Sequence, residues 1–305
     1  MIWKDYKAKI QSIDCSTLTS EDIQLSLLRE DLIHPEISGN KYRRLKYNLL
    51  EAKQKGYTKL ITFGGAFSNH IAATAAAGKI YNFETIGIIR GEELINKIEE
   101  NPTLRFAQQN GMKLHFISRE NYRNKNEADF LKQLKIQFPA TYIVPEGGTN
   151  DLAIKGCEEI LYDACHPFDF IACAIGTAGT IAGLIESSQP HQHILGFPSL
   201  KGDFIQKEVE KLTQKRNFTI FNEYHFGGYG KVSDELINFV NDFKRSTKIQ
   251  LDQIYTGKMA FGVNQLIKNH YFSRNSKILM IHTGGLQGIE GMNQQLIRKN
   301  KITIK

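Results

Sequence analysis

A glycine-rich loop, IGTAGTIAG at 175–183, ends an apolar run and precedes a helical pattern that begins at about Ile181. Small residues at 176–180 let backbone N–H groups and the start of the helix point at an anion. The loop lacks the Gly-Lys-[Ser/Thr] ending of a Walker A motif and does not fit the GxGxxG pattern of dinucleotide-binding folds. Anion binding is therefore the functional interpretation, and a tight turn without a ligand explains the loop equally well.

A second group of residues, ISGNKYRRL at 37–45, places a lysine where a helix is expected to begin. Ser-Gly-Asn is typical of a turn, and the helix should start near Asn40. Lys41 would then lie in the first helical turn, where the helix dipole disfavours a cation. Such a lysine loses its proton more readily and can act as an amine nucleophile. Taken alone, a solvated surface lysine is the simpler explanation.

The segment GGAFSNH at 64–70 precedes an alanine-rich stretch that is typical of a helix. Ser68 and Asn69 belong to the residue types that cap helix N-termini, and capping alone would explain them. His70 by itself is more typical of a structural histidine than of a catalyst.

Apolar, β-branched runs alternate with helical patterns along the chain. Helices are expected at 68–80, 102–111, 153–165 and from about 181, and strands, several running into a glycine turn, at 59–65, 84–91, 113–118, 141–148, 168–180, 193–199, 248–255 and 277–285. This alternation predicts an α/β protein with open, mostly parallel sheets flanked by helices. Ligands in such folds bind at the carboxyl ends of strands, where the glycine-rich turns lie.

The chain has 305 residues and a formal net charge of +7, and its basic residues are spread out. The densest basic run, KYRRLK at 41–46, belongs to no known nucleic-acid-binding motif. No apolar run approaches the roughly 20 residues of a membrane span. We therefore expect neither a nucleic acid nor a membrane as a partner. The first residues lack the apolar stretch of a secretory signal, which predicts a cytoplasmic protein.

The four cysteines show no CxxC spacing, so neither a metal site nor a disulfide framework is expected. They are Cys15, Cys157, Cys165 and Cys173.

Six motifs then occur in an order known from one enzyme family: SGNKYRRL, GGAFSNHIAATAAAG, PEGGTN, IGTAGTIAGL, YTGK and HTGG. On these motifs the chain resembles the pyridoxal-phosphate-dependent family that contains 1-aminocyclopropane-1-carboxylate deaminase and D-cysteine desulfhydrase. That family has the tryptophan-synthase-β-like fold, also called fold type II. The resemblance covers nearly the whole chain, and six ordered motifs are far more specific than any one of them.

The resemblance implies that Lys41 carries pyridoxal 5'-phosphate as a Schiff base and, once released, moves a proton at the substrate Cα. It implies that Asn69 hydrogen-bonds the ring hydroxyl of the cofactor and that Thr283 of HTGG places a hydroxyl near the pyridine nitrogen. The phosphate would lie in the glycine-rich loop. Backbone amides and two hydroxyls would hold it there, from Gly176, Thr177, Ala178, Gly179 and Thr180.

The same resemblance implies that Ser68, Tyr229 and Tyr255 lie on the substrate side as catalytic residues, together with Lys41. For the two tyrosines, packing or structural hydrogen bonding is the alternative. The ring-opening deaminases of the family typically carry glutamate after the second tyrosine, near the pyridine nitrogen. This chain has Thr256 there, as desulfhydrase-type members do.

A two-domain organisation also follows from the resemblance. Residues 1–44 and 161–305 would form a large cofactor-binding domain, and residues 45–160 a small inserted α/β domain. The active site would lie between the two, and family members are commonly homodimers.

Three functions are compatible with the sequence. The first is β-elimination from D-cysteine or a related small β-substituted amino acid, which gives pyruvate, ammonia and sulfide. The second is ring-opening deamination of 1-aminocyclopropane-1-carboxylate. The third, from a different class, is a catalytically quiet protein that binds pyridoxal phosphate. A hydroxyl near the pyridine nitrogen favours the first, because the departing thiolate carries away the electron pair and a weaker electron sink suffices.

Overall fold

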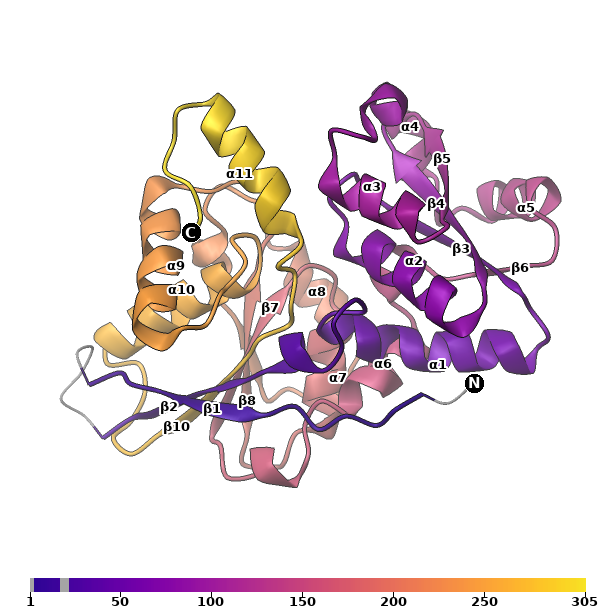
Figure 1. Ribbon diagram of the computed structural model, residues 1–305. Coiled ribbons are helices and arrows are strands. Elements are labelled where there is room, and N and C mark those ends of the chain that lie inside the picture. Colours follow the sequence, from indigo (N-terminus) through magenta and orange to yellow (C-terminus); the bar gives the residue numbers. More distant parts are fainter. Residues whose placement is uncertain (1–2, 17–21) are drawn as a thin grey trace.

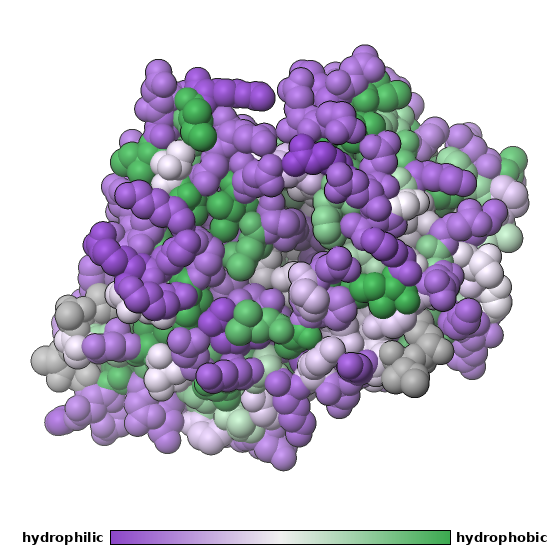
Figure 2. All heavy atoms as spheres, in the orientation of Figure 1, coloured by the Kyte–Doolittle hydropathy of each residue, from purple (hydrophilic) through white to green (hydrophobic). Residues whose placement is uncertain are grey.

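The computed structural model describes residues 3–16 and 22–305, which form two sheets with helices packed on both faces (Figure 1). No helix in these described ranges is both long and apolar enough to cross a membrane. Hydrophilic side chains cover most of the face seen in Figure 2.

The smaller sheet has four parallel strands in the order β5-β4-β3-β6. These strands are β5 (Lys113–Ile117), β4 (Glu84–Arg90), β3 (Lys59–Gly64) and β6 (Thr141–Ile143). Helices α2 (Asn69–Tyr81) and α3 (Pro102–Gln109) supply Ile71 and Leu104 to the core on one face. Helices α4 (Arg119–Arg123) and α5 (Ala128–Gln137) supply Tyr122 and Leu134 on the other. Burial on both faces explains why these strands are apolar runs rather than alternating ones.

The larger sheet has six strands in the order β1-β2-β10-β7-β8-β9, and only β1 pairs with its neighbour in antiparallel fashion. The strands are β1 (Ile10–Ile13), β2 (Gln24–Leu28), β7 (Phe170–Ile175), β8 (His193–Pro198), β9 (Phe218–Ile220) and β10 (Lys277–Ile281). Because side chains alternate along β7, Ile171 and Cys173 lie in the core on one face, and Ala172 and Ala174 lie in the core on the other.

Each core of the larger sheet is closed by its own helices. The first core packs against α1 (Asn40–Gln54), α6 (Asp151–Glu158), α7 (Gly179–Ser187) and α8 (Phe204–Glu210). The second packs against α9 (Asp234–Thr247), α10 (Thr256–Lys268) and α11 (Gly288–Arg298). Short 3-10 turns complete the described part of the chain: η1 (Glu30–Leu32), η2 (Glu92–Lys97), η3 (Glu146–Gly148), η4 (Asp163–Cys165) and η5 (Asn222–His225).

The α/β class with mostly parallel sheets is confirmed, but the strand predicted at 248–255 is wrong. Ile249 and Leu251 are buried, as the apolar pattern indicates. However, the carboxylate of Asp252 accepts hydrogen bonds from the amides of Ile254 and Tyr255. This local cap turns the backbone into α10 instead of leaving it free to pair with a strand. The short strands β1, β2 and β9 were not among the predicted elements.

The strands of the smaller sheet all lie between residues 59 and 143, and those of the larger sheet lie before residue 29 and after residue 169. We propose that the smaller domain lies within residues 45–160, with α1 and α6 at its two ends packed against the core of the larger sheet.

Candidate active site

A cavity of about 470 Å³ lies where the carboxyl ends of strands from both sheets converge. Gly65 follows β3, Arg90 ends β4, Gly176 follows β7 and Thr283 follows β10. This is the edge at which open α/β sheets bind ligands. The predicted site residues on its wall are Lys41, Ser68, Asn69, Gly176, Thr177, Thr180, Tyr229, Tyr255 and Thr283.

Lys41 is the second residue of α1, and the turn before it rests on the turn after β10. Gly39 has a φ of +62°, and a Cβ atom there would lie 2.0 Å from the backbone oxygen of Thr283. The Asn40 amide donates to that same oxygen at 3.2 Å. Only glycine permits this close approach, so the Ser-Gly-Asn turn fixes the position of Lys41 relative to Thr283.

Burial, together with the positive charge of Arg44, lowers the pKa of Lys41 to about 7. No carboxylate from the described ranges pairs with its ammonium group. A large fraction of Lys41 is therefore unprotonated near neutral pH, which an amine nucleophile or base requires.

The glycine-rich loop connects β7 to α7, which begins at Gly179, slightly earlier than expected. Gly176, Thr177 and Thr180 line the cavity, whereas Ala178 and Gly179 are buried behind them in the first helical turn. The Thr180 hydroxyl accepts a hydrogen bond from the Asn40 side chain at 2.9 Å. The start of α7, whose first amides have no partner within the helix, therefore lies at the cavity wall.

Arg44 is a cavity residue that the sequence prediction missed. Its side chain is 1% exposed, donates to Thr177 Oγ1 at 2.8 Å, and also contacts Thr149 Oγ1. Its Nε has no partner among the described residues. The motif was expected to hold an anion without a cation, but Arg44 supplies one. Its spacing from Lys41 (i, i+3) was the signal, because such residues share a helix face.

Asn69 and Ser68 start α2 at the cavity. Ser68 is the N-cap and accepts a hydrogen bond from the Ile71 amide at 3.3 Å, so capping is confirmed, while the residue also lines the cavity. The Asn69 side chain accepts a hydrogen bond from Gln287 Nε2 at 2.5 Å. His70 is buried and bonded to Thr62, as expected for a structural histidine.

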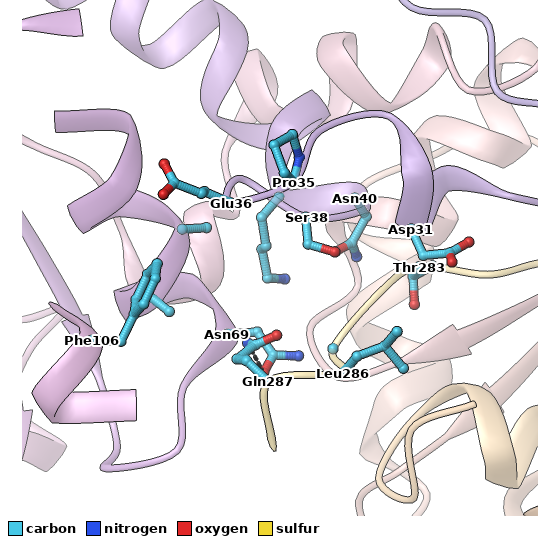
Figure 3. A pocket seen from close by; sticks show the side chains of 14 residues that line it. Asp31, Pro35, Glu36, Ser38, Asn40, Asn69, Phe106, Thr283, Leu286 and Gln287 are labelled. Atoms are coloured by element: carbon cyan, nitrogen blue, oxygen red, sulfur yellow. Dashed lines mark hydrogen bonds between the residues drawn. The ribbon is translucent and has the colours of Figure 1, made fainter. Parts of the chain in front are cut away.

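A smaller cavity of about 220 Å³ shares Asn40, Lys41, Asn69 and Thr283 with the first. Figure 3 shows the bond between Asn69 and Gln287 closing one side of this pocket, with Thr283 and Leu286 beside it. Lys41 and Thr283 therefore line both cavities.

Two tyrosines, Tyr229 and Tyr255, also line the larger cavity. Their ring centroids lie 6.2 Å apart, with Tyr229 on a loop and 42% exposed and Tyr255 directly before α10. Gly176 leaves room for Tyr255, because a Cβ atom there would lie 2.8 Å from its ring. Burial and the neighbouring Tyr229 raise the pKa of Tyr255 well above 10, so its phenol stays neutral.

Residues 13–284 match the family model described as pyridoxal-phosphate dependent enzyme. The chain belongs to this family of pyridoxal-phosphate-dependent enzymes. A bifunctional D-cysteine desulfhydrase/1-aminocyclopropane-1-carboxylate deaminase from Arabidopsis thaliana is 30% identical over 87% of this chain and 73% of that protein.

Solved structures agree on the fold. The crystal structure of an ACC deaminase homologue matches with a TM-score of 0.79 and 26% identity, covering 96% of this chain and 94% of the other. An O-acetylserine dependent cystathionine beta-synthase from Helicobacter pylori matches with a TM-score of 0.67 over 94% and 95% of the two chains. Its 13% identity supports the shared fold alone.

The residues present fit the cofactor of this pyridoxal-phosphate family. Lys41 offers an amine of lowered pKa, and the buried Arg44 guanidinium beside Thr177 offers a cation for the phosphate. No cluster of three or more metal-ligating side chains occurs within residues 3–16 and 22–305.

Thr256, like Ala178 and Gly179, lines neither cavity. It is fully buried, and its hydroxyl donates to Asp252 Oδ1 at 2.7 Å and accepts from the Asp252 amide at 3.0 Å. Thr283, in contrast to Thr256, lies on the cavity wall. Thr256 therefore acts on the site through the backbone that positions Tyr255.

Proposed function

We propose that this enzyme catalyses β-elimination from D-cysteine or a closely related small β-substituted amino acid. Water is consumed, and pyruvate, ammonia and hydrogen sulfide are formed. The Arabidopsis relative is named in part as a D-cysteine desulfhydrase, which supports this substrate class.

Pyridoxal phosphate, when bound, draws electrons away from the substrate Cα and so makes its proton acidic. Lys41 takes that proton on Nζ, for which its lowered pKa suits it. The Cβ–S bond then breaks and the thiolate leaves with the bonding electrons. Hydrolysis of the remaining three-carbon fragment gives pyruvate and ammonia.

The observation that carries the choice of reaction is Thr283 on the cavity wall, and the absence of a glutamate at position 256 supports it. Thr283 lines the cavity with a hydroxyl, and Thr256 stands where the resembled deaminases have glutamate. Glu146 is the one carboxylate among the described residues of the larger cavity, and it is engaged by Tyr122 at 2.7 Å and Lys125 at 3.3 Å. A hydroxyl does not force protonation of the pyridine nitrogen, which favours a reaction with a good leaving group.

Other residues that line the cavity with Lys41 would orient the substrate. We propose that Ser68, Tyr229 and Tyr255 contact the bound amino acid, that Asn69 binds the ring hydroxyl of the cofactor, and that the 176–180 loop with Arg44 binds its phosphate. We further propose a homodimer in the cytoplasm.

Ring-opening deamination of 1-aminocyclopropane-1-carboxylate is the second candidate, because the Arabidopsis relative also bears that name. It breaks a carbon–carbon bond with no ordinary leaving group and no Cα proton, and so needs a stronger electron sink. A quiet pyridoxal-phosphate-binding protein is the candidate from another class. Lys41, Ser68 and both tyrosines line one cavity, which argues for turnover.

A panel of D-cysteine, L-cysteine, β-chloro-D-alanine, D-serine and 1-aminocyclopropane-1-carboxylate tests the proposal, with keto acid, ammonia and sulfide measured in each reaction. Equimolar pyruvate, ammonia and sulfide from D-cysteine are expected, with loss of nearly all turnover in Lys41→Ala. Borohydride reduction and peptide mapping should place the pyridoxyl group on Lys41. If the cofactor is bound but no substrate gives a product, the proposed reaction is wrong and the protein only binds pyridoxal phosphate.

A further inference from the structure

The loop that carries Tyr229 adopts a backbone that an unrestrained chain rarely holds. Phe226, Gly227, Gly228 and Gly230 have φ values of +53°, +88°, +109° and +68°. Glycine tolerates this region but loses more conformational entropy than other residues when it is ordered. Something in the surrounding structure must therefore fix this loop if Tyr229 is to keep one position.

Lys258, in the first turn of α10, contacts this loop directly. Its side chain is 1% exposed, and its ammonium group donates to the backbone oxygens of His225 at 2.8 Å and Gly228 at 2.9 Å. The same two oxygens accept the turn bonds of the loop, from the Gly228 amide at 3.0 Å and the Lys231 amide at 3.1 Å. Lys258 therefore joins two successive turns, 225–228 and 228–231, which meet at Gly228.

A buried ammonium group at this position is costly. Charges lose hydration on burial, and the N-terminal end of a helix repels a cation. No carboxylate of the described ranges lies within ion-pair distance of Lys258, and the carboxylate of Asp252 is occupied by the amides that begin α10. Burial lowers the pKa of Lys258 to about 8. The two loop carbonyls are thus the hydrogen-bond acceptors that offset this cost, beside the longer-range charge of Asp252.

We infer that Lys258 is a positioning residue that holds the 225–231 loop closed against α10 and thereby places Tyr229 beside Tyr255 in the cavity. This inference rests on the proposed function only in taking Tyr229 as a substrate contact. Phe226 adds a second anchor, because its ring lies 4.9 Å from that of Phe261 on the same helix. The hydrogen bonds of Lys258 restrict the orientation of the loop more than this ring contact does, because they fix two backbone carbonyls.

The test compares cofactor-loaded wild type with Lys258→Met, which keeps the side-chain length and removes the ammonium group. Lys268→Met is the matched control, because Lys268 is exposed at the other end of α10. Amide hydrogen exchange is measured without substrate. In Lys258→Met we expect the Gly228 and Lys231 amides to exchange at least about tenfold faster, equivalent to about 1.4 kcal/mol, with α7 unchanged. The side chain of Lys258→Gln can still donate a hydrogen bond, so its exchange rates should lie between those of wild type and Lys258→Met. This variant replaces Lys258→Met if Lys258→Met misfolds.

Kinetics with D-cysteine complete the test. We expect KM to rise about tenfold with kcat changed less than about twofold, and the double variant with Tyr229→Ala to be no worse than Tyr229→Ala alone. Unchanged exchange in the loop, or fully additive kinetic losses, would refute the inference. If wild type does not act on D-cysteine, the proposed function fails, and hydrogen exchange alone decides the role of Lys258.

Discussion

The guanidinium group of Arg44 donates a hydrogen bond of 2.8 Å to the hydroxyl of Thr177, although 133 positions separate them in sequence. This bond joins the helix that carries Lys41 to the glycine-rich loop before α7. The same cation lowers the pKa of Lys41. Arg44 therefore connects the glycine-rich loop with the amine of Lys41.

Arg44→Met should weaken binding of pyridoxal phosphate about tenfold to a hundredfold. A charge-assisted hydrogen bond contributes about 1.5–3 kcal/mol, and each 1.4 kcal/mol is a factor of ten. Titration of the cofactor-free protein with cofactor measures the effect. Arg105→Met removes an equal charge from the surface of α3 and should leave the affinity unchanged. Equal affinities for all three proteins would show that Arg44 does not contact the phosphate.

Gly179→Asp should abolish tight cofactor binding in a protein that still folds. A Cβ atom at this position would lie 2.9 Å from Arg44 Nη2. The added carboxylate would pair with that guanidinium and repel the phosphate. Thr177→Ala should cost less, because it removes one hydroxyl and leaves the amides. Circular dichroism checks folding, and undiminished affinity in Gly179→Asp would refute the placement of the phosphate.

The pH dependence of cofactor attachment should report the pKa of Lys41. Because burial and Arg44 lower that pKa to about 7, the ammonium form dominates below pH 7 and the reactive amine above it. The rate of attachment to the cofactor-free protein should therefore fall about tenfold per pH unit below 7 and level off above it. In Arg44→Met, removal of the neighbouring charge should move the midpoint upward. A wild-type midpoint near 10 would contradict the assignment.

Thr256→Val should destabilise the start of α10. The Thr256 hydroxyl donates to Asp252 Oδ1 and accepts from the Asp252 amide, and both bonds are buried. Leaving buried partners unsatisfied costs about 1–3 kcal/mol each. Urea unfolding of the cofactor-free protein measures the loss. Thr256→Ser keeps the hydroxyl and should remain within about 1 kcal/mol of wild type.

The sequence was sufficient to place Lys41 at the start of a helix and the 176–180 loop after a buried strand. Both follow from local signals, since turn residues and apolar runs act over a few positions. Local signals also explain the error at 248–255, where apolar alternation resembles a strand. The hydrogen bonds from backbone amides to Asp252 override that pattern.

The role of Arg44 depends on tertiary structure. The spacing of Arg44 from Lys41 indicates a shared helix face, but the contacts with Thr149 and Thr177 come from distant parts of the chain. The burial of Thr256 away from both cavities could not be predicted from the sequence either, because it depends on how the start of α10 packs. The wall around Tyr229 and Tyr255 was anticipated only through the family resemblance.

The most direct test is the ratio of kcat/KM for D-cysteine and for 1-aminocyclopropane-1-carboxylate on one preparation of cofactor-loaded enzyme. Sulfide and pyruvate report elimination, and 2-oxobutyrate reports ring opening. With a hydroxyl at Thr283 and no glutamate at position 256, D-cysteine should be preferred by at least about tenfold, which corresponds to about 1.4 kcal/mol between the two transition states. Efficient formation of 2-oxobutyrate, with D-cysteine inert, would contradict the proposed reaction.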